Sequence, residues 1–334
     1  MGNMSVLIKQ RVRTIIFVAL ASAVALTGLL GSQSYAQTPG SNNVLKISPL
    51  RTDIQVAAGS SKTVQITITN PTSSEISITP IENDFTSGDE NGTPAVILDA
   101  NTFAPTHSLK RFMAPLSPIV IPVGQSKTIT VTINVPASAQ AGGYFGAIRF
   151  TPTTAGSGGQ VNLSASAASL ILLTVPGPTV EKLNLTDFLV QQKGITGSFF
   201  STPTDLTTFL RFENKGNIQD APFGNIAVKQ NGKVVYETDF NITQPRDVVL
   251  PDGARRWDVP LKDIGTFGYF TVTATLTYGT NNSTIEVSRS FWVVPTLYII
   301  LGIAGVVLLI AIIIFIILMI RRSRHRRSRG GYRR

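Results

Sequence analysis

GSSKTVQITITNP, residues 59–71, returns almost unchanged as GQSKTITVTINVP at residues 124–136. In both stretches every second residue is apolar and mostly β-branched, which is typical of a half-buried β-strand. The distance from one stretch to the next is short for a complete β-sandwich of about 100 residues. We therefore predict two strands of one domain that are entered through similar loops. Tandem duplication of a small domain is the alternative.

Each of these two strands has the same start and the same end. Gly59 and Gly124 stand where a tight turn leads into the strand. Pro71 and Pro136 follow the strands, and proline ends a β-ladder because it lacks a backbone N–H. We expect these four residues to shape the fold.

The same alternation continues between the two ends of the chain. Short β-branched runs are separated by turn sequences, and Asn231-Gly232 predicts a two-residue hairpin within residues 227–237. No stretch of this region has a convincing helical period. The predicted fold class is therefore all-β, with sandwiches or barrels as the architectures that fit short strands.

A second repeat predicts how many domains there are. Gly143-Tyr144 and Gly268-Tyr269 each open a strand after a turn of small residues, far enough apart for two sandwiches. Each tyrosine suits a tyrosine corner, in which its hydroxyl bonds to backbone, or a plain core aromatic. We predict two tandem immunoglobulin-like β-sandwiches, residues 44–176 and 179–295, joined by a hinge at 177–178.

The N-terminus has the three parts of a secretory signal peptide. Basic residues precede an apolar run, and small residues precede a cleavage position after Ala36. We predict a signal peptide at residues 1–36 and a linker at 37–43. An uncleaved anchor is the alternative.

The C-terminus predicts a single transmembrane helix. Residues 296–320 carry no charge and are long enough to cross the hydrocarbon core of a membrane. The tail, 321–334, is basic, so the positive-inside rule places it in the cytoplasm and the preceding domains outside the cell. The tail arginines predicted to set this topology and to contact anionic lipid are Arg321, Arg322, Arg324, Arg326 and Arg327.

Charge and cysteine usage narrow the function classes. The net charge of +10 comes from the two ends, and the middle of the chain has no basic patch with stacking aromatics. This pattern does not fit nucleic-acid binding. The chain has no cysteine, which is ordinary for a bacterial surface protein whose domains rely on core burial.

The sequence offers little for catalysis. His107 is the one histidine before the predicted helix, and neither a zinc-protease motif nor a nucleophile-elbow motif is present. The acidic turn SGDENG, residues 87–92, lacks the spaced ligands of an EF-hand, which leaves weak calcium binding as a minor alternative. We predict a protein that is not an enzyme and has no cofactor.

One short stretch is a candidate contact surface. Arg255 and Arg256 precede Trp257, and arginine and tryptophan are favoured at protein interfaces. The other interpretation, which we favour, is that Trp257 lies in the core of a sandwich.

Residues 47–150 resemble the N-terminal domain of the WxL-interacting proteins of Gram-positive bacteria. The matching points are Ser48-Pro49, Gly59, Asn70, Gly124, Pro136, Gly142-Gly143-Tyr144 and Gly146-Ala147-Ile148. The resemblance implies a first domain that binds peptidoglycan and a second immunoglobulin-like domain that holds a wall-associated protein. We therefore expect a tether at the cell membrane. A chaperone-like assembly factor that caps its partner by β-strand addition is the alternative, and a glycan-processing enzyme ranks last.

Overall fold

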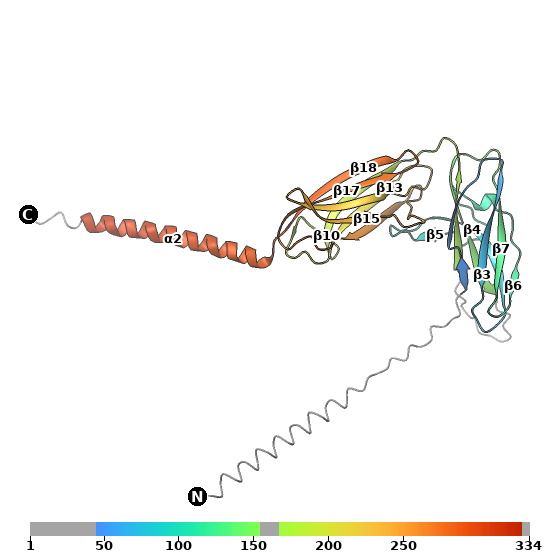
Figure 1. Ribbon diagram of the computed structural model, residues 1–334, viewed down its shortest axis with the longest axis horizontal. Coiled ribbons are helices and arrows are strands. Elements are labelled where there is room, and N and C mark those ends of the chain that lie inside the picture. The colour runs from blue at the N-terminus through green and yellow to red at the C-terminus, as the bar shows by residue number, and fades with distance from the viewer. Residues whose placement is uncertain (1–44, 154–166, 329–334) are drawn as a thin grey trace, which may run out of the picture. The chain divides into compact units, whose positions relative to one another are not determined.

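The computed structural model of the chain describes residues 45–153 and 167–328 (Figure 1). The predicted signal peptide, 1–36, and linker, 37–43, lie outside these residues. The described part consists of β-strands, one short 3-10 helix and one long C-terminal helix. The prediction of a chain that is mostly β is therefore confirmed.

Strands β1–β9 form two sheets, which we call the first sheet pair. One sheet has the order β1-β3-β7, and the other has the order β2-β9-β8-β4-β5 with β6 also paired to β4. The strands are β1 (Lys46–Ser48), β2 (Arg51–Gln55), β3 (Ser61–Thr69), β4 (Ile76–Ser87), β5 (Pro94–Val96), β6 (Ile119–Ile121), β7 (Ser126–Asn134), β8 (Gly142–Thr153) and β9 (Ala167–Val175). The 3-10 helix η1 (Lys110–Phe112) lies between β5 and β6.

The two repeated stretches are neighbouring strands. β3 pairs antiparallel with β7, with Val64 opposite Val131 and Ile66 opposite Ile129. These residues are buried, and they share a core with Ile148 and Phe150 of the opposing sheet. The period-two pattern thus places one face of each strand in the core, and the direct pairing of β3 with β7 agrees with the prediction of two strands of one domain.

Strands β10–β18 form the second sheet pair, with the sheet orders β11-β10-β13-β16 and β12-β18-β17-β14-β15. The strands are β10 (Leu183–Gln192), β11 (Ile195–Thr196), β12 (Phe199–Phe200), β13 (Leu206–Asn214), β14 (Phe223–Gln230), β15 (Lys233–Phe240), β16 (Ala254–Pro260), β17 (Gly268–Tyr278) and β18 (Ser283–Val293). A separate core, including Phe212 and Phe270, fills the space between these sheets. The β14–β15 hairpin turns at Asn231-Gly232, where both residues have positive φ, as predicted.

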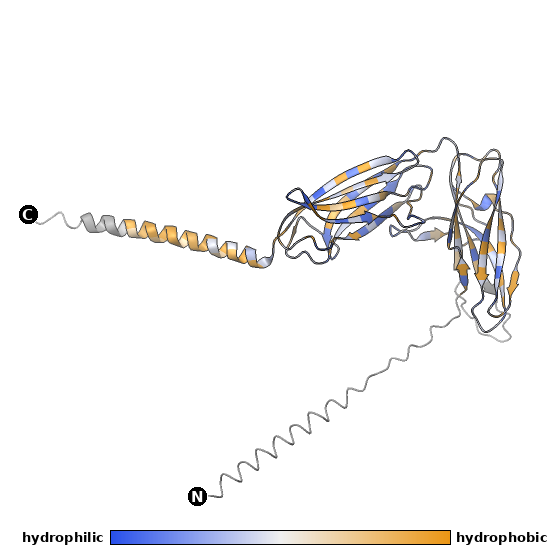
Figure 2. Cartoon of the chain, viewed as in Figure 1, coloured by the Kyte–Doolittle hydropathy of each residue, from blue (hydrophilic) through white to orange (hydrophobic). Residues whose placement is uncertain are grey.

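Helix α2 (Thr296–Ser328) follows β18 after two residues. Its stretch Thr296–Ile320 is long and apolar enough to cross a membrane, and the apolar residues run along its whole length (Figure 2). This agrees with a membrane anchor at the predicted position. The helix continues past Ile320 through the first basic residues of the tail.

Each sheet pair contains a fully buried asparagine at the C-terminal end of a strand. Asn70 follows β3 and donates from Nδ2 to the Ile121 carbonyl at 3.0 Å. Asn214 is the last residue of β13 and donates from Nδ2 to the Val249 carbonyl at 2.8 Å. Both side chains also bond to the backbone of their own turn. A buried amide that joins a turn to a distant strand or loop fixes how the chain crosses between the two sheets.

Replacing Asn70 with alanine should destabilise the first sheet pair by about 2–4 kcal/mol, because the Ile121 carbonyl loses a buried donor and Thr72 loses its acceptor at Asn70 Oδ1. Urea unfolding of residues 44–295, followed by circular dichroism, measures the change. Asn134→Ala is the matched control, because Asn134 is exposed and its Oδ1 accepts a hydrogen bond from the Ser61 hydroxyl at 2.9 Å. Equal midpoints for the two variants would contradict a structural role for Asn70.

Candidate binding surface

The long loop between β5 and β6 is held by one buried carboxylate. Asp84, in β4, is fully buried. It accepts hydrogen bonds from the backbone N–H groups of Ala104 at 2.9 Å and Lys110 at 2.8 Å, and from the Ser108 hydroxyl at 2.6 Å. Three donors compensate for taking the carboxylate out of water, so the loop has a fixed shape.

This loop presents an aromatic ring between two cations. Phe103 is 41% exposed, the Lys110 ammonium lies 4.7 Å from its ring centroid, and the Arg111 guanidinium lies 4.5 Å from it. Lys110 also donates to the Ala100 and Thr102 carbonyls, so the ammonium braces the loop. We call Phe103, Lys110 and Arg111 the Phe103 patch. It offers an apolar ring and positive charge side by side on a pre-shaped loop.

His107 has a structural contact. Its Nδ1 lies 2.6 Å from the Gly143 carbonyl oxygen, and its backbone carbonyl accepts the Phe145 N–H at 2.8 Å. Its ring packs 5.8 Å from the Phe145 ring. These contacts tie the loop to the start of β8.

The acidic turn predicted as a minor calcium alternative uses its carboxylates internally. Asp89 accepts the N–H groups of Asn91 and Thr93, each at 2.9 Å, and these bonds lower the pKa of its carboxyl group. Glu90 points away from the turn and binds an arginine. Across the described ranges 45–153 and 167–320, no three His, Cys, Asp or Glu side chains are grouped as metal ligands would be.

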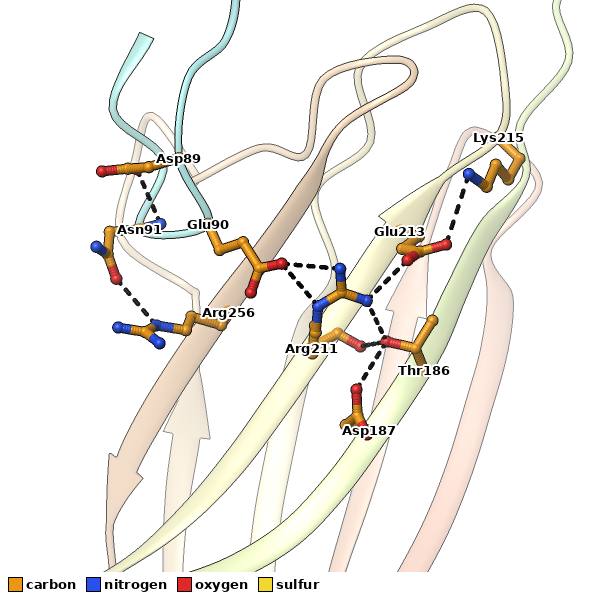
Figure 3. A network of polar contacts seen from close by, with 9 residues as sticks. All are labelled: Asp89, Glu90, Asn91, Thr186, Asp187, Arg211, Glu213, Lys215 and Arg256. Carbon is orange, nitrogen blue, oxygen red and sulfur yellow. Dashed lines mark hydrogen bonds and ion pairs between the residues drawn. The ribbon is translucent and has the colours of Figure 1, made fainter. Parts of the chain in front are cut away.

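The same turn contacts the second sheet pair through Arg211 (Figure 3). The Arg211 guanidinium donates from Nε and Nη2 to one carboxylate oxygen of Glu90, at 2.9 and 2.8 Å, and from Nη1 to Glu213 at 2.8 Å. Lys215 lies 3.5 Å from Glu213. Hydrogen bonding to Arg211 lowers the pKa of Glu90 and of Glu213. Both carboxylates are therefore charged and paired at neutral pH.

The two arginines singled out in the sequence make contacts within the chain. Arg256 donates its backbone N–H to the Glu90 carbonyl at 2.6 Å and its Nε to the Asn91 side chain at 3.0 Å (Figure 3). Arg255 pairs with Asp247 at 2.9 Å. Arg256 thus contributes to a junction between the two sheet pairs.

Trp257 packs against the core of the second sheet pair. Its ring makes edge contacts with Phe212 at 5.6 Å and Phe240 at 5.5 Å. This is the environment that the core interpretation of Trp257 requires.

Two of the glycines that carry the family resemblance, Gly142 and Gly143, lie at the same junction. Gly143 donates its N–H to the Asn217 carbonyl at 2.8 Å, and the Asn217 side chain donates to the Ala141 carbonyl at 3.0 Å. A Cβ atom at Gly142 would lie 2.9 Å from the Asn217 carbonyl oxygen, and one at Gly143 would lie 2.7 Å from the side-chain oxygen of Gln219. Only glycine permits this approach without displacing the neighbour.

Apolar side chains fill the centre of the junction. Phe85, Phe145 and Leu172 form a small cluster on the first sheet pair, and Val248 and Leu250 of the second sheet pair pack against it. A cavity of about 190 Å³ remains beside these residues. The junction therefore has an apolar centre with charge pairs around it, as protein interfaces do.

The second sheet pair carries an open groove across β10, β13 and β16. Its lining includes the aromatic residue Phe209 and the charged residues Lys193, Arg256, Asp258 and Lys262. Mixed charges beside an aromatic ring suit contact with a polar polymer or a protein surface.

The remaining residues predicted to shape the fold lie in turns and at strand ends. Gly59 and Gly124 have φ of 77° and 68° in the turns that precede β3 and β7. Pro71 and Pro136 lie one or two residues beyond the ends of these strands. The positive φ of Gly59 and of Gly124 is a conformation that glycine adopts at little cost.

The two glycine–tyrosine repeats differ in structure. Tyr144 donates its hydroxyl to the Gln140 carbonyl at 2.9 Å, and burial raises its pKa. Tyr269 is 47% exposed and packs on Trp292, while Gly268 opens β17 with φ of 132°. The hydroxyl-to-backbone bond of a tyrosine corner is therefore present at Tyr144.

Sequence reasoning missed the Phe103 patch and the Glu90–Arg211 pair. Phenylalanine is most often found in the core, and no local pattern in the sequence marks Phe103 as exposed. Glu90 and Arg211 are far apart in the chain, so no short motif could have joined them.

Residues 52–152 match the protein-family model described as WxL Interacting Protein, peptidoglycan binding domain. This stretch of the chain is therefore similar to the peptidoglycan-binding domain of the WxL-interacting proteins. The match runs from the start of β2 almost to the end of β8, so it includes the loop with the Phe103 patch and confirms the resemblance seen in the sequence. No curated protein matches this chain.

Several solved structures share a distant similarity with this chain. A chaperone–tip adhesin complex of CFA/I fimbriae aligns at 12% identity and a TM-score of 0.36, over 75% of this chain and 99% of the other. The class 5 fimbriae chaperone CfaA aligns at 12% and 0.37, over 74% and 98%. The E. coli chaperone DraB aligns at 13% and 0.34, over 74% and 96%.

The Glu90–Arg211 pair should contribute only a small coupling energy, because both side chains are partly exposed. A double-mutant cycle with Glu90→Gln and Arg211→Gln should give less than about 1 kcal/mol, decreasing further in high salt. Urea unfolding of residues 44–295 measures it, with Lys193→Gln and Asp205→Asn as a control cycle at an exposed pair. A coupling of several kcal/mol that is insensitive to salt would contradict this estimate.

Asp220 provides a test by pH. It is 3% exposed, its backbone pairs with Val249, and its Oδ2 has no hydrogen-bond partner in the described part of the chain. Burial, followed by the charge of Glu181, raises the pKa of Asp220 to about 7. Between about pH 4 and pH 7 the folded state keeps a proton that the unfolded state has lost.

The Asp220 contribution to stability should therefore decrease as pH rises from 4 to 7 and stay level above that. The difference in unfolding free energy between Asp220→Asn and the unmodified chain should shift by on the order of 3 kcal/mol across this range. Urea unfolding at pH 5 and pH 7.5 measures it. Asp258→Asn, at an exposed aspartate, is the control, and parallel pH profiles for Asp220→Asn and the unmodified chain would refute the raised pKa.

Proposed function

We propose that this protein tethers the bacterial cell wall to the membrane, with the first sheet pair binding peptidoglycan. The match of residues 52–152 to a peptidoglycan-binding family carries the proposal. The protein acts by binding and has no catalytic role.

The Phe103 patch is the proposed contact with peptidoglycan. Sugar rings present C–H faces that stack on aromatic rings, and the peptide stems of peptidoglycan bear carboxylates that Lys110 and Arg111 can pair with. The loop is already fixed by Asp84, so little conformational entropy is lost on binding. These features support the patch as the binding site.

The proposed architecture follows the family. The two sheet pairs are two immunoglobulin-like domains, residues 44–176 and 179–295, with a hinge at 177–178. Thr296–Ile320 is the membrane span, and the basic tail lies in the cytoplasm, where its arginines contact anionic lipid. A wall-associated protein is the proposed partner of the groove across β10, β13 and β16, whose mixed charges and aromatic lining residue support a protein contact.

Phe103→Ala and Arg111→Ala should each weaken binding to peptidoglycan roughly tenfold, because aromatic and arginine contacts at the centre of an interface carry 1–3 kcal/mol each. Sedimentation of residues 44–295 with protein-stripped peptidoglycan sacculi measures binding. Lys233→Ala, at an exposed lysine of β15, is the matched control. Unchanged sedimentation of both patch variants would move the binding site elsewhere, and failure of the unmodified protein to sediment would overturn peptidoglycan binding.

A further inference from the structure

The second sheet pair exposes aromatic side chains at the end from which helix α2 departs. β18 ends at Val293 and α2 begins at Thr296. At this end β12, the start of β17 and the end of β18 meet. The exposed fractions are 74% for Phe199, 51% for Phe267, 47% for Tyr269 and 38% for Trp292. We call these four residues the aromatic end.

The aromatic end is continuous with the helix. β12 pairs with β18 so that Phe199 lies opposite Trp292, and the Tyr269 ring lies 5.1 Å from the Trp292 ring. The Phe267 ring lies 5.1 Å from the ring of Tyr298, which is in the first turn of α2. Rings from three separate segments thus lead directly to the start of the apolar helix.

The connection between β18 and α2 is short and held by hydrogen bonds. The Val294 N–H bonds to the Phe200 carbonyl at 2.8 Å, and the Tyr298 N–H bonds to the Pro295 carbonyl at 2.9 Å. The four Cα-to-Cα steps from Trp292 to Thr296 reach at most about 14 Å even when fully extended. The head-group layer of a bilayer is roughly 5–8 Å thick on each side of the hydrocarbon core. A helix that spans the membrane therefore brings the aromatic end to the membrane surface.

We propose that the aromatic end inserts into the head-group layer on the outer face of the cell membrane, so that the second sheet pair contacts the bilayer. The proposal rests on the membrane anchor of the proposed function. Tryptophan and tyrosine favour the membrane–water interface because one side of each ring is apolar and the other is polar. If a flexible linker held the second sheet pair away from the membrane, the four aromatic rings at this end would remain exposed to water. A lipid surface covers them.

Lysines placed at the same ends of neighbouring strands suit this partner. Lys193 follows β10, Lys233 begins β15 and Lys262 follows β16. β10 and β16 flank β13, and β15 pairs with β14 whose last residue, Gln230, lies opposite Phe270 near the start of β17. Ammonium groups here can pair with lipid phosphates, which adds a salt-dependent attraction to the apolar contact.

The chain contains no cysteine, so a single spin label reports depth without other changes. In the full chain, reconstituted in nanodiscs of phosphatidylglycerol and phosphatidylcholine, Phe199→Cys carries the label. Position 199 is far from the helix in sequence, so a loosely tethered sheet pair would leave it in water. Val180→Cys is the matched control, because Val180 is also exposed and precedes β10 at the opposite end of that strand.

We expect the label at position 199 to be accessible to oxygen and shielded from a water-soluble nickel complex at least threefold relative to the label at 180. Adding Phe267→Ser and Tyr269→Ser should abolish that difference. Equal access of nickel to both positions would overturn the proposal. A label shielded from both quenchers would also overturn it, in favour of a protein partner or a second copy of the chain. Failure of the full chain to co-elute with nanodiscs would overturn the membrane anchor itself, which separates the two proposals.

Discussion

The buried amide of Asn70 is the constraint on which the first sheet pair depends. Strand β3 can pack its apolar face inward only if the chain leaves it at a fixed point and crosses to β4 in the other sheet. Asn70 fixes that point by bonding across to the Ile121 carbonyl. Asn214 does the same at the end of β13 in the second sheet pair, by bonding to the Val249 carbonyl. Two parts of the chain with little sequence in common thus each use a buried asparagine to fix where the chain leaves a strand.

The shape of the first sheet pair then determines the junction. Gly142 and Gly143 open β8, and their missing side chains let Asn217 and Gln219 come into contact with the β8 backbone. The Arg211–Glu90 pair at the same junction is partly exposed and contributes little energy. The specificity of the junction therefore comes from close backbone contact and apolar packing of residues such as Val248, with charge pairing as a secondary term.

Much of the fold could be predicted from the sequence, since it depends on local signals. The period-two pattern of β3 and β7, the hairpin at Asn231-Gly232 and the charge-free run at 296–320 each follow from neighbouring residues. The Phe103 patch depends on a bond between the loop and Asp84, which lies about twenty residues earlier in β4. Such long-range contacts have no local pattern, so the sequence predicted the family but did not predict the surface.

The position of a phenylalanine in the fold decides its role. Phe212 and Phe270 fill a core, Phe103 faces solvent between two cations, and Phe199 faces solvent at the end of a strand next to the helix. An exposed ring costs solubility unless a partner covers it. Phe103 has cations beside it, which suits an anionic polymer, while Phe199 has further rings and the start of a membrane helix beside it, which suits lipid. The proposed wall contact at Phe103 and the proposed membrane contact at Phe199 together give the two attachments that the proposed tether requires.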